Sequence, residues 1–190
     1  MTQPDTPVLA DNRSQAGAFT WKRAIAIAIG ALVVAISAQF SIDLPGNPVP
    51  ITLQGLAVLL VGGTLGARAG AAALVAYLIA GMSGLPVFSG GRAGAAWLLG
   101  PTGGYLLAFP VGAAITGAIA RRHDLVRCFV AALAGMAVIH LGGIAQLSIL
   151  SGGWTLPFRA TAPLIAADLV KVVIAALLVS RLRAGPSPRA

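Results

Sequence analysis

The sequence contains no glutamate, so its five acidic residues are all aspartates. Without glutamate it cannot carry the His-Glu-x-x-His zinc motif, and its two histidines and single cysteine do not form a metal-ligand cluster. Neither of its two lysines follows the glycine pattern of a phosphate-binding loop, which excludes ATP hydrolysis at such a site. The lone Cys128 excludes a disulfide within the chain. We therefore expect no metal, no cofactor and no ATPase activity of that kind.

Charge of either sign is scarce. Charged residues make up 9% of the 190 residues and hydrophobic residues 57%, whereas a soluble domain carries about 25% charged residues. This composition predicts an all-α integral membrane protein with room for about six short spans joined by tight loops. We expect a disordered segment over 1–20, one six-helix transmembrane domain over 21–183 and a tail over 184–190. The net charge of +8 does not indicate nucleic acid, because the basic residues flank apolar runs.

The basic residues also predict the orientation in the membrane. If the N-terminus is cytoplasmic and six spans alternate, only Arg92 and Arg159 lie outside, and Lys171 lies within the membrane. The basic residues then inside are Arg13, Lys22, Arg23, Arg68, Arg121, Arg122, Arg127, Arg181, Arg183 and Arg189. This asymmetry predicts a multi-pass protein of the cytoplasmic (inner) membrane with both termini in the cytoplasm. The outer loops would be Ser41–Pro50, Gly84–Gly103 and Ser151–Ala160.

The last apolar run, Thr161–Ser180, contains two ionisable residues, Asp168 and Lys171. A charge near the bilayer centre costs roughly 2.5–3.5 kcal/mol on insertion scales, so such residues face protein or a wet cavity. Their i, i+3 spacing puts them on one helical face within reach of each other. Asp168 lies about 10 Å below the start of the run, a depth that a small polar ligand can reach from outside. We favour a ligand site over an ion pair that merely fixes helix packing.

Two other features each allow two interpretations. Ala24, Ala28, Ala31 and Ala35 fall on one face of the first span, Ala24–Phe40, where small residues let another helix approach closely. That helix belongs either to this bundle or to a separate membrane subunit. Similarly, Gln54 near the start of the second span either binds ligand or bonds to a neighbouring helix.

One enzymatic pattern deserves comparison. Gly81-Met82-Ser83-Gly84 resembles the nucleophile segment of rhomboid intramembrane proteases, and His140 could complete a Ser–His dyad. Glycine and serine are abundant here, so chance matches are easy, and a protease leaves Asp168 and Lys171 without a role. We favour His140 as a hydrogen-bonded packing residue and expect that the protein is not an enzyme.

Four segments, taken together and in order, resemble the BioY family, the biotin-specific S components of energy-coupling factor (ECF) transporters. They are Pro50–Gln54, Gly84–Phe88, Gly100–Tyr105 and Asp168–Lys171, and the resemblance covers about Trp21 to Arg183. It implies a six-helix membrane fold that takes up the vitamin biotin from outside. It also implies partners: a transmembrane coupling protein and two ATP-binding-cassette ATPases. The same architecture serving another vitamin is the alternative.

The resemblance also implies roles for individual residues. An Ala-x-x-x-Ala contact with the coupling protein is matched by Ala24/Ala28 and Ala31/Ala35, and Ser41–Pro50 resembles a lid. Biotin has a ureido ring with two N–H donors and a carbonyl acceptor, which suits Asp168 and Lys171. The candidate substrate-binding residues are Asp168, Lys171, Tyr105, Arg92, Phe88, Gln54, Gly104 and Trp97, although Trp97 fits an interface anchor equally well. The candidate lid residues are Pro45, Asn47, Pro48 and Val49.

Overall fold

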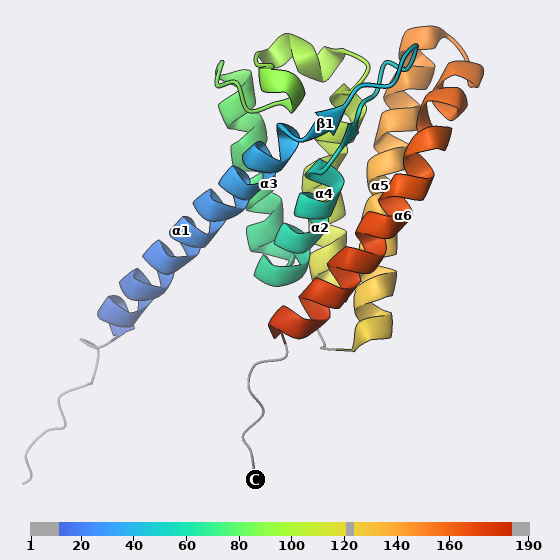
Figure 1. Ribbon diagram of the computed structural model, residues 1–190. Helices are drawn as coiled ribbons and strands as arrows, with labels where there is room; N and C mark the ends of the chain where they lie inside the picture. The colour runs from blue at the N-terminus through green and yellow to red at the C-terminus, as the bar shows by residue number, and fades with distance from the viewer. Residues whose placement is uncertain (1–11, 121–123, 184–190) are drawn as a thin grey trace, which may run out of the picture.

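The computed structural model describes residues 12–120 and 124–183. It confirms an all-α architecture of six helices, with one small β-ribbon and two short 3-10 helices, η1 and η2 (Figure 1). In chain order the elements are α1 (Asn12–Ala38), β1 (Ser41–Ile42), β2 (Ile51–Thr52), α2 (Gln54–Leu65), α3 (Ala67–Met82), η1 (Ser89–Gly91), η2 (Ala95–Leu99), α4 (Gly103–Ile119), α5 (Leu125–Ser151) and α6 (Thr155–Arg183).

The helices differ in length, and this difference has a structural consequence. Within the described residues, α1, α5 and α6 are long and apolar enough to cross a membrane, whereas α2, α3 and α4 are shorter apolar helices. The 12 residues of α2 extend about 18 Å, well short of a hydrocarbon core of about 30 Å. Helix α2 packs against α1, α3, α4 and α6, and none of its residues is exposed, so protein rather than lipid surrounds this short helix.

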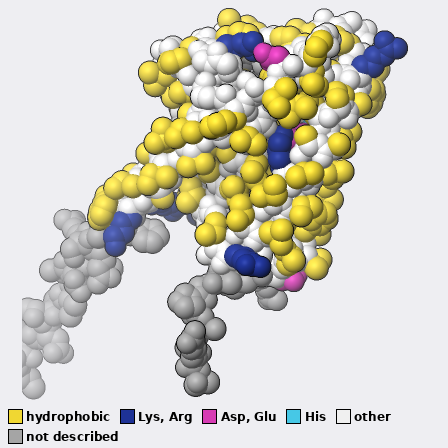
Figure 2. Space-filling view, in the orientation of Figure 1, with side chains coloured by type: hydrophobic (Ala, Val, Ile, Leu, Met, Phe, Trp, Pro, Cys, Tyr) yellow, Lys and Arg dark blue, Asp and Glu magenta, His cyan; other side chains and the backbone are white. Residues whose placement is uncertain are grey.

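The connections sort to two ends of the bundle. The β-ribbon, η1, η2 and the α5–α6 turn lie together at the upper end in Figure 1. The α2–α3 turn, the start of α5 and the end of α6 lie at the opposite end. Figure 2 shows hydrophobic side chains over most of the face between, with Lys and Arg near both ends and one further basic patch between them. The three loops predicted to share one side of the membrane therefore do lie at one end.

Three predicted boundaries differ from the structure. The segment Ser41–Pro50 is not loop throughout, because Ser41–Ile42 pairs antiparallel with Ile51–Thr52. The β-branched residues of these short strands favour the extended backbone. At the other end of the chain, α1 begins at Asn12, before the predicted start of the ordered domain at Trp21. Residues 1–11 and the tail over 184–190 lie outside the described residues.

The predicted loop Ser151–Ala160 is also wrong. Helix α5 continues to Ser151, Gly152 ends it with a left-handed φ of 66°, and α6 already begins at Thr155. Pro157 lies in the first turn of α6. Proline is tolerated in the first turn of a helix, where its missing N–H would have no partner within the helix. The loop at this position is therefore much shorter than predicted.

Glycines let the short inner helices come into backbone contact. A Cβ at Gly62 of α2 would overlap the backbone of Ala113 on α4. A Cβ at Gly117 of α4 would in turn meet the Gly62 carbonyl oxygen at 2.5 Å. Close approach through small residues is the usual basis of helix packing in a bilayer, where lipid is as apolar as the side chains.

We expect Gly62→Ala to destabilise the protein, although alanine is the better helix former. Overpacking a tight contact costs about 1–3 kcal/mol, because α2 and α4 must separate to admit the methyl group. The measurement is the midpoint of thermal unfolding of the purified protein in detergent. Gly153→Ala is the matched control, because no atom lies within 4 Å of a Cβ there. Equal midpoints for both variants and the parent would contradict this packing.

Candidate functional site

A pocket opens beside the N-terminal end of α2, under the β1–β2 loop. Its lining comes from that loop, the start of α2, the η1–η2 region, α4, α5 and α6. Thr52, Gln54 and Gly55 form the part contributed by β2 and α2. The pocket thus lies where α2 stops short of the end of the bundle, and elements from most of the chain close around it.

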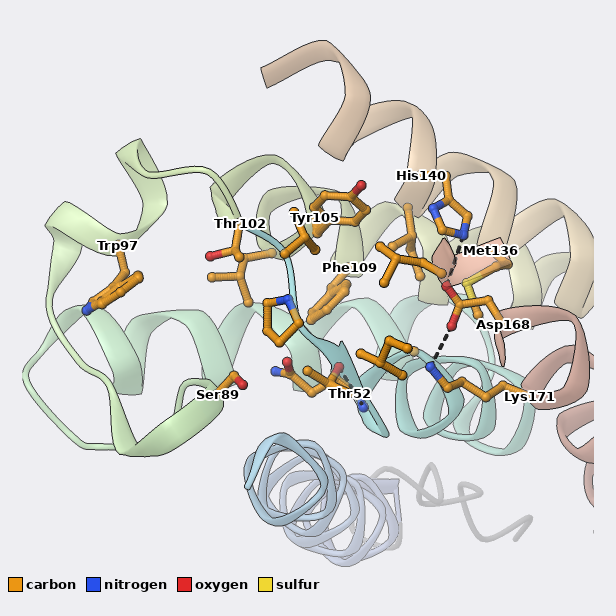
Figure 3. A pocket seen from close by; sticks show the side chains of 18 of the residues that line it. Thr52, Ser89, Trp97, Thr102, Tyr105, Phe109, Met136, His140, Asp168 and Lys171 are labelled. Atoms are coloured by element: carbon orange, nitrogen blue, oxygen red, sulfur yellow. Dashed lines mark hydrogen bonds and ion pairs between the residues drawn. The ribbon is translucent and has the colours of Figure 1, made fainter. Parts of the chain in front are cut away.

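One end of the pocket carries a buried cluster of charged groups (Figure 3). The Lys171 ammonium donates to Asp168 Oδ1 at 2.6 Å, and His140 Nε2 lies 3.0 Å from Asp168 Oδ2. Asp168 and Lys171 are each 8% exposed, and all three residues line the pocket. The predicted pairing of Asp168 with Lys171 is therefore present, and the pair faces a cavity within the protein.

His140 is a pocket residue that the sequence analysis treated as packing. It projects from α5, and its ring meets that of Tyr105 edge to face at a centroid distance of 6.0 Å. The signal that could have identified it is the one used for Asp168, an ionisable side chain inside an apolar span. Within the residues that the structure describes, no group of three potential ligands could hold a metal ion.

The opposite end of the pocket is aromatic and basic. Trp97 lies far from Asp168 in Figure 3, and the Arg92 guanidinium stacks over its ring, 4.6 Å from the centroid. Between the two ends stands Tyr105, whose hydroxyl bonds to Thr161 Oγ1 at 2.9 Å. The predicted residues Arg92, Trp97 and Tyr105 all line the pocket. A guest molecule would meet the acid–amine pair at one end and a guanidinium at the other.

Gln54 bonds to a neighbouring helix and also lines the pocket, so its binding of ligand stays a prediction. It lines the pocket and is only 4% exposed. Its amide nitrogen donates to the Tyr77 hydroxyl of α3 at 2.7 Å, and that hydroxyl donates to the Val87 carbonyl at 3.2 Å. The start of α2 is thereby joined to α3 and to the segment before η1.

Two predicted substrate-binding residues lie outside the pocket. Phe88 is 2% exposed and packs edge to face on Tyr77, against the bare backbone of Gly81. Gly104 serves the contact between α4 and α5, where a Cβ would overlap the Gly142 carbonyl. Both belong to motifs whose neighbours, Ser89 and Tyr105, do line the pocket. Their positions correct the sequence analysis, which could not tell a residue that lines the pocket from one that packs behind it.

The β1–β2 loop covers the pocket and is fastened to α6. Asn47 Nδ2 donates to the Ala160 carbonyl at 2.9 Å, while Asn47 Oδ1 accepts from the Val49 amide at 3.0 Å. Val49 is 5% exposed and lines the pocket, whereas Pro45 and Pro48 are exposed on the outer side. The loop is therefore a closed cover whose last two residues, Val49 and Pro50, line the pocket.

No Ser–His dyad forms among the described residues. Ser83 is exposed at the end of α3 and its hydroxyl donates to the Ile79 carbonyl at 2.8 Å. His140 instead faces Asp168 through its Nε2 and lines the pocket, whose lining does not include Ser83. The partial resemblance to rhomboid proteases therefore has no counterpart in the geometry.

The alanine stripe of α1 divides into two parts. Ala31 and Ala35 are half-buried and pack against the core of the bundle. Ala24 and Ala28 are exposed, on the part of α1 that diverges from the other helices in Figure 1. Internal packing thus accounts for the second pair, and only the first pair is left open for another protein.

Gln39, directly after α1, fixes the pocket wall to that helix. Its amide nitrogen donates to the Phe88 carbonyl at 3.3 Å, and its Oε1 accepts from the Gly91 amide at 3.1 Å. These two backbone groups flank Ser89, which lines the pocket. The sequence carries no signal for this contact, because Gln39 and the segment Phe88–Gly91 are distant in the chain.

Comparisons with known proteins agree on one family. The model of the BioY family matches residues 11–186. A protein named biotin transporter BioY from Rhizobium etli is 40% identical, over 78% of this chain and 85% of its own length. A probable biotin transporter BioY from Pyrococcus horikoshii is 36% identical, over 83% of this chain and 93% of its own length.

A solved structure has the same fold. The S component for biotin from an ECF-type ABC transporter superposes with a TM-score of 0.81 and is 26% identical in sequence. The match covers 95% of this chain and 97% of that protein. Similarity of this extent includes every helix that contributes to the pocket.

We expect Gln39→Ala to loosen the segment around η1, because the Gly91 amide loses its acceptor. A net hydrogen bond contributes about 0.5–1.5 kcal/mol, so deuterium exchange at Gly91 should accelerate about fivefold. Mass spectrometry of peptides spanning η1 measures this. Gln39→Glu is the control, because it keeps a side-chain oxygen for that amide. Unchanged exchange in Gln39→Ala would show that the contact does not restrain the loop.

Proposed function

This chain belongs to the BioY family, and we propose that it is the biotin-binding membrane subunit, the S component, of an ECF transporter for vitamin uptake. The observation that supports this most directly is the Asp168–Lys171 pair at one end of a covered pocket. Intramembrane ionisable groups mark substrate sites by default. The protein is a transport subunit and not an enzyme.

The chemistry of the pocket suits biotin from end to end. Asp168 offers carboxylate oxygens to a ureido N–H, and Lys171 has donors left for the ureido carbonyl. Apolar side chains such as Phe109, Met136 and Leu164 line the part in which the sulfur ring would lie. Arg92, stacked on Trp97 at the other end, would bind the carboxylate of the valerate tail. Few polar groups set in apolar walls are typical of a small-molecule site.

Access to the pocket requires the β1–β2 loop to move. A side-chain bond from Asn47 to the Ala160 carbonyl fastens the loop to α6, and the prolines of the loop keep it stiff. In the proposed cycle the loop opens to admit biotin from outside and closes over it. A partner module of a transmembrane coupling protein and two ATPases then reorients the subunit, and biotin is released to the cytoplasm.

The orientation in the membrane is part of the same proposal. The covered pocket lies at the end that holds Arg92 and Arg159, while Arg68 in the first turn of α3, Arg127 near the start of α5 and Arg181 near the end of α6 lie at the other. Arg121, Arg122 and Arg189 lie outside the described residues. By the positive-inside rule, the end with more basic residues faces the cytoplasm of the inner membrane, which places the pocket outside and both termini inside.

We expect Asp168→Asn to lower biotin affinity by about 10- to 100-fold, because the ureido N–H loses a charged acceptor, and a hydrogen bond to a charged group contributes about 1.5–3 kcal/mol. Binding of labelled biotin to the purified, monodisperse variant measures this. Asp43→Asn makes the same chemical change at an exposed aspartate and should bind normally.

Two outcomes of the same assay would contradict the proposal. Retention of full affinity by Asp168→Asn would remove the carboxylate from the site. Displacement of the label by thiamine or riboflavin as readily as by biotin would assign the pocket to another vitamin. Mass spectrometry of the small molecule that copurifies with the parent protein identifies the ligand independently.

We expect Ala28→Leu to impair biotin uptake in cells that carry the partner module while leaving biotin binding by the isolated subunit unchanged. The added side chain would hold another helix away from the exposed Ala24/Ala28 face. Ala166→Leu, at an exposed alanine of α6, is the control and should support normal uptake. Loss of binding in Ala28→Leu would instead assign this face to packing within the bundle.

A further inference from the structure

One nitrogen in the pocket has no partner. Among the described residues, Nδ1 of His140 is the single buried side-chain nitrogen or oxygen without a hydrogen bond. The imidazole lines the pocket and is 15% exposed. In Figure 3 its Nε2 is directed at Asp168, and the other ring nitrogen points away from that carboxylate. Buried polar atoms are nearly always bonded, so each exception requires an explanation.

The neighbours of His140 determine what Nδ1 can do. Nε2 must carry a hydrogen, because it lies 3.0 Å from a carboxylate oxygen and two lone pairs would repel. With Asp168 negative and Lys171 positive, a neutral imidazole gives the cluster no net charge, whereas an imidazolium would leave one unbalanced charge in a site of low dielectric. A neutral ring with its hydrogen on Nε2 presents Nδ1 as an acceptor.

Residues 12–120 and 124–183 place no hydrogen-bond donor at this acceptor. The Tyr105 ring faces His140 edge to face, but its hydroxyl is paired with Thr161. Lys171 and Asp168 bond to each other, and Asp168 also engages the far nitrogen of the ring. Satisfaction of Nδ1 therefore requires a donor that enters the pocket.

We propose that His140 Nδ1 accepts a hydrogen bond from one ureido N–H of the ligand, an inference that rests on the proposed function. A cyclic urea carries two N–H donors on either side of one carbonyl. The cluster supplies the complement: Nδ1 accepts from one N–H, Asp168 accepts from the other, and Lys171 donates to the carbonyl. His140 thus binds one side of the ureido group directly, in addition to holding Asp168 in position.

Two substitutions separate these roles, because each keeps one end of the imidazole. His140→Gln places an amide nitrogen near the position of Nε2, so it retains a donor for Asp168 and loses the acceptor. His140→Asn keeps a polar atom near the position of Nδ1 and loses the contact with Asp168. Size-exclusion profiles and thermal midpoints show whether each variant is folded.

The ligands are biotin and its two cyclic carbamate analogues, in each of which one ureido N–H is replaced by oxygen. We expect His140→Gln to bind biotin about tenfold more weakly or worse, since a buried donor loses its acceptor. The parent should bind the analogue that lacks the N–H facing Nδ1 more weakly than it binds biotin. His140→Gln has no acceptor for that N–H, so it should bind this analogue and biotin with equal affinity. The other analogue should remain disfavoured, because its missing N–H faces Asp168. His140→Asn should still distinguish the first analogue from biotin.

Equal biotin affinity in His140→Gln and the parent would overturn the inference. So would losses that are the same for biotin and both analogues, because they would mean that His140 acts only through Asp168. Failure of the parent protein to bind biotin would instead refute the proposed function. The affinities of the parent and of His140→Gln for biotin and for each analogue form a double-mutant cycle. This cycle isolates the contact between His140 and one N–H from general effects on the fold.

Discussion

The site is organised around a pair of opposite charges that are almost completely buried, each 8% exposed. Each charge alone is costly at this depth, and the two are tolerable only because 2.6 Å separates ammonium from carboxylate and protein surrounds both. This constraint determines which face of α6 turns inward. It also brings α5 against α6, since His140 supplies the bond for the second carboxylate oxygen.

The cavity beside this cluster exists because one helix is short. Helix α2 begins at Gln54, and the chain before it runs as a ribbon and a proline-rich loop over the space that a longer helix would fill. Glycine contacts at Gly62 and Gly117 draw α2 and α4 together below that space. Tight packing below and a short helix above thus produce a pocket with a rigid base and a cover made of a loop.

The sequence predicts the surroundings of a residue best where burying that residue type in an apolar span is costly. It predicts them least well where only the position of the side chain decides whether it faces the pocket. A charge in an apolar run identified Asp168 and Lys171, and the asymmetry of arginines identified which loops lie together. Phe88 and Gly104 are next in the chain to the pocket residues Ser89 and Tyr105, but they pack behind the pocket wall. Residue type does not reveal which of two adjacent residues faces the pocket. The α5–α6 loop was overestimated because proline fits a first helical turn as well as a loop. His140 was passed over because a histidine can be satisfied by packing neighbours, and its free nitrogen is visible only in three dimensions.

The Gln39 contact gives α1 a mechanical role. The chain leads from the end of α1 directly into the β-ribbon that carries the cover, and Gln39, the first residue after the helix, bonds to the backbone on either side of Ser89. A tilt of α1 would therefore move the β1–β2 loop and the segment around η1 together. Under the proposed function, a coupling protein bound to the exposed Ala24/Ala28 part of α1 would therefore control the cover of the pocket from a distance, without contacting the ligand.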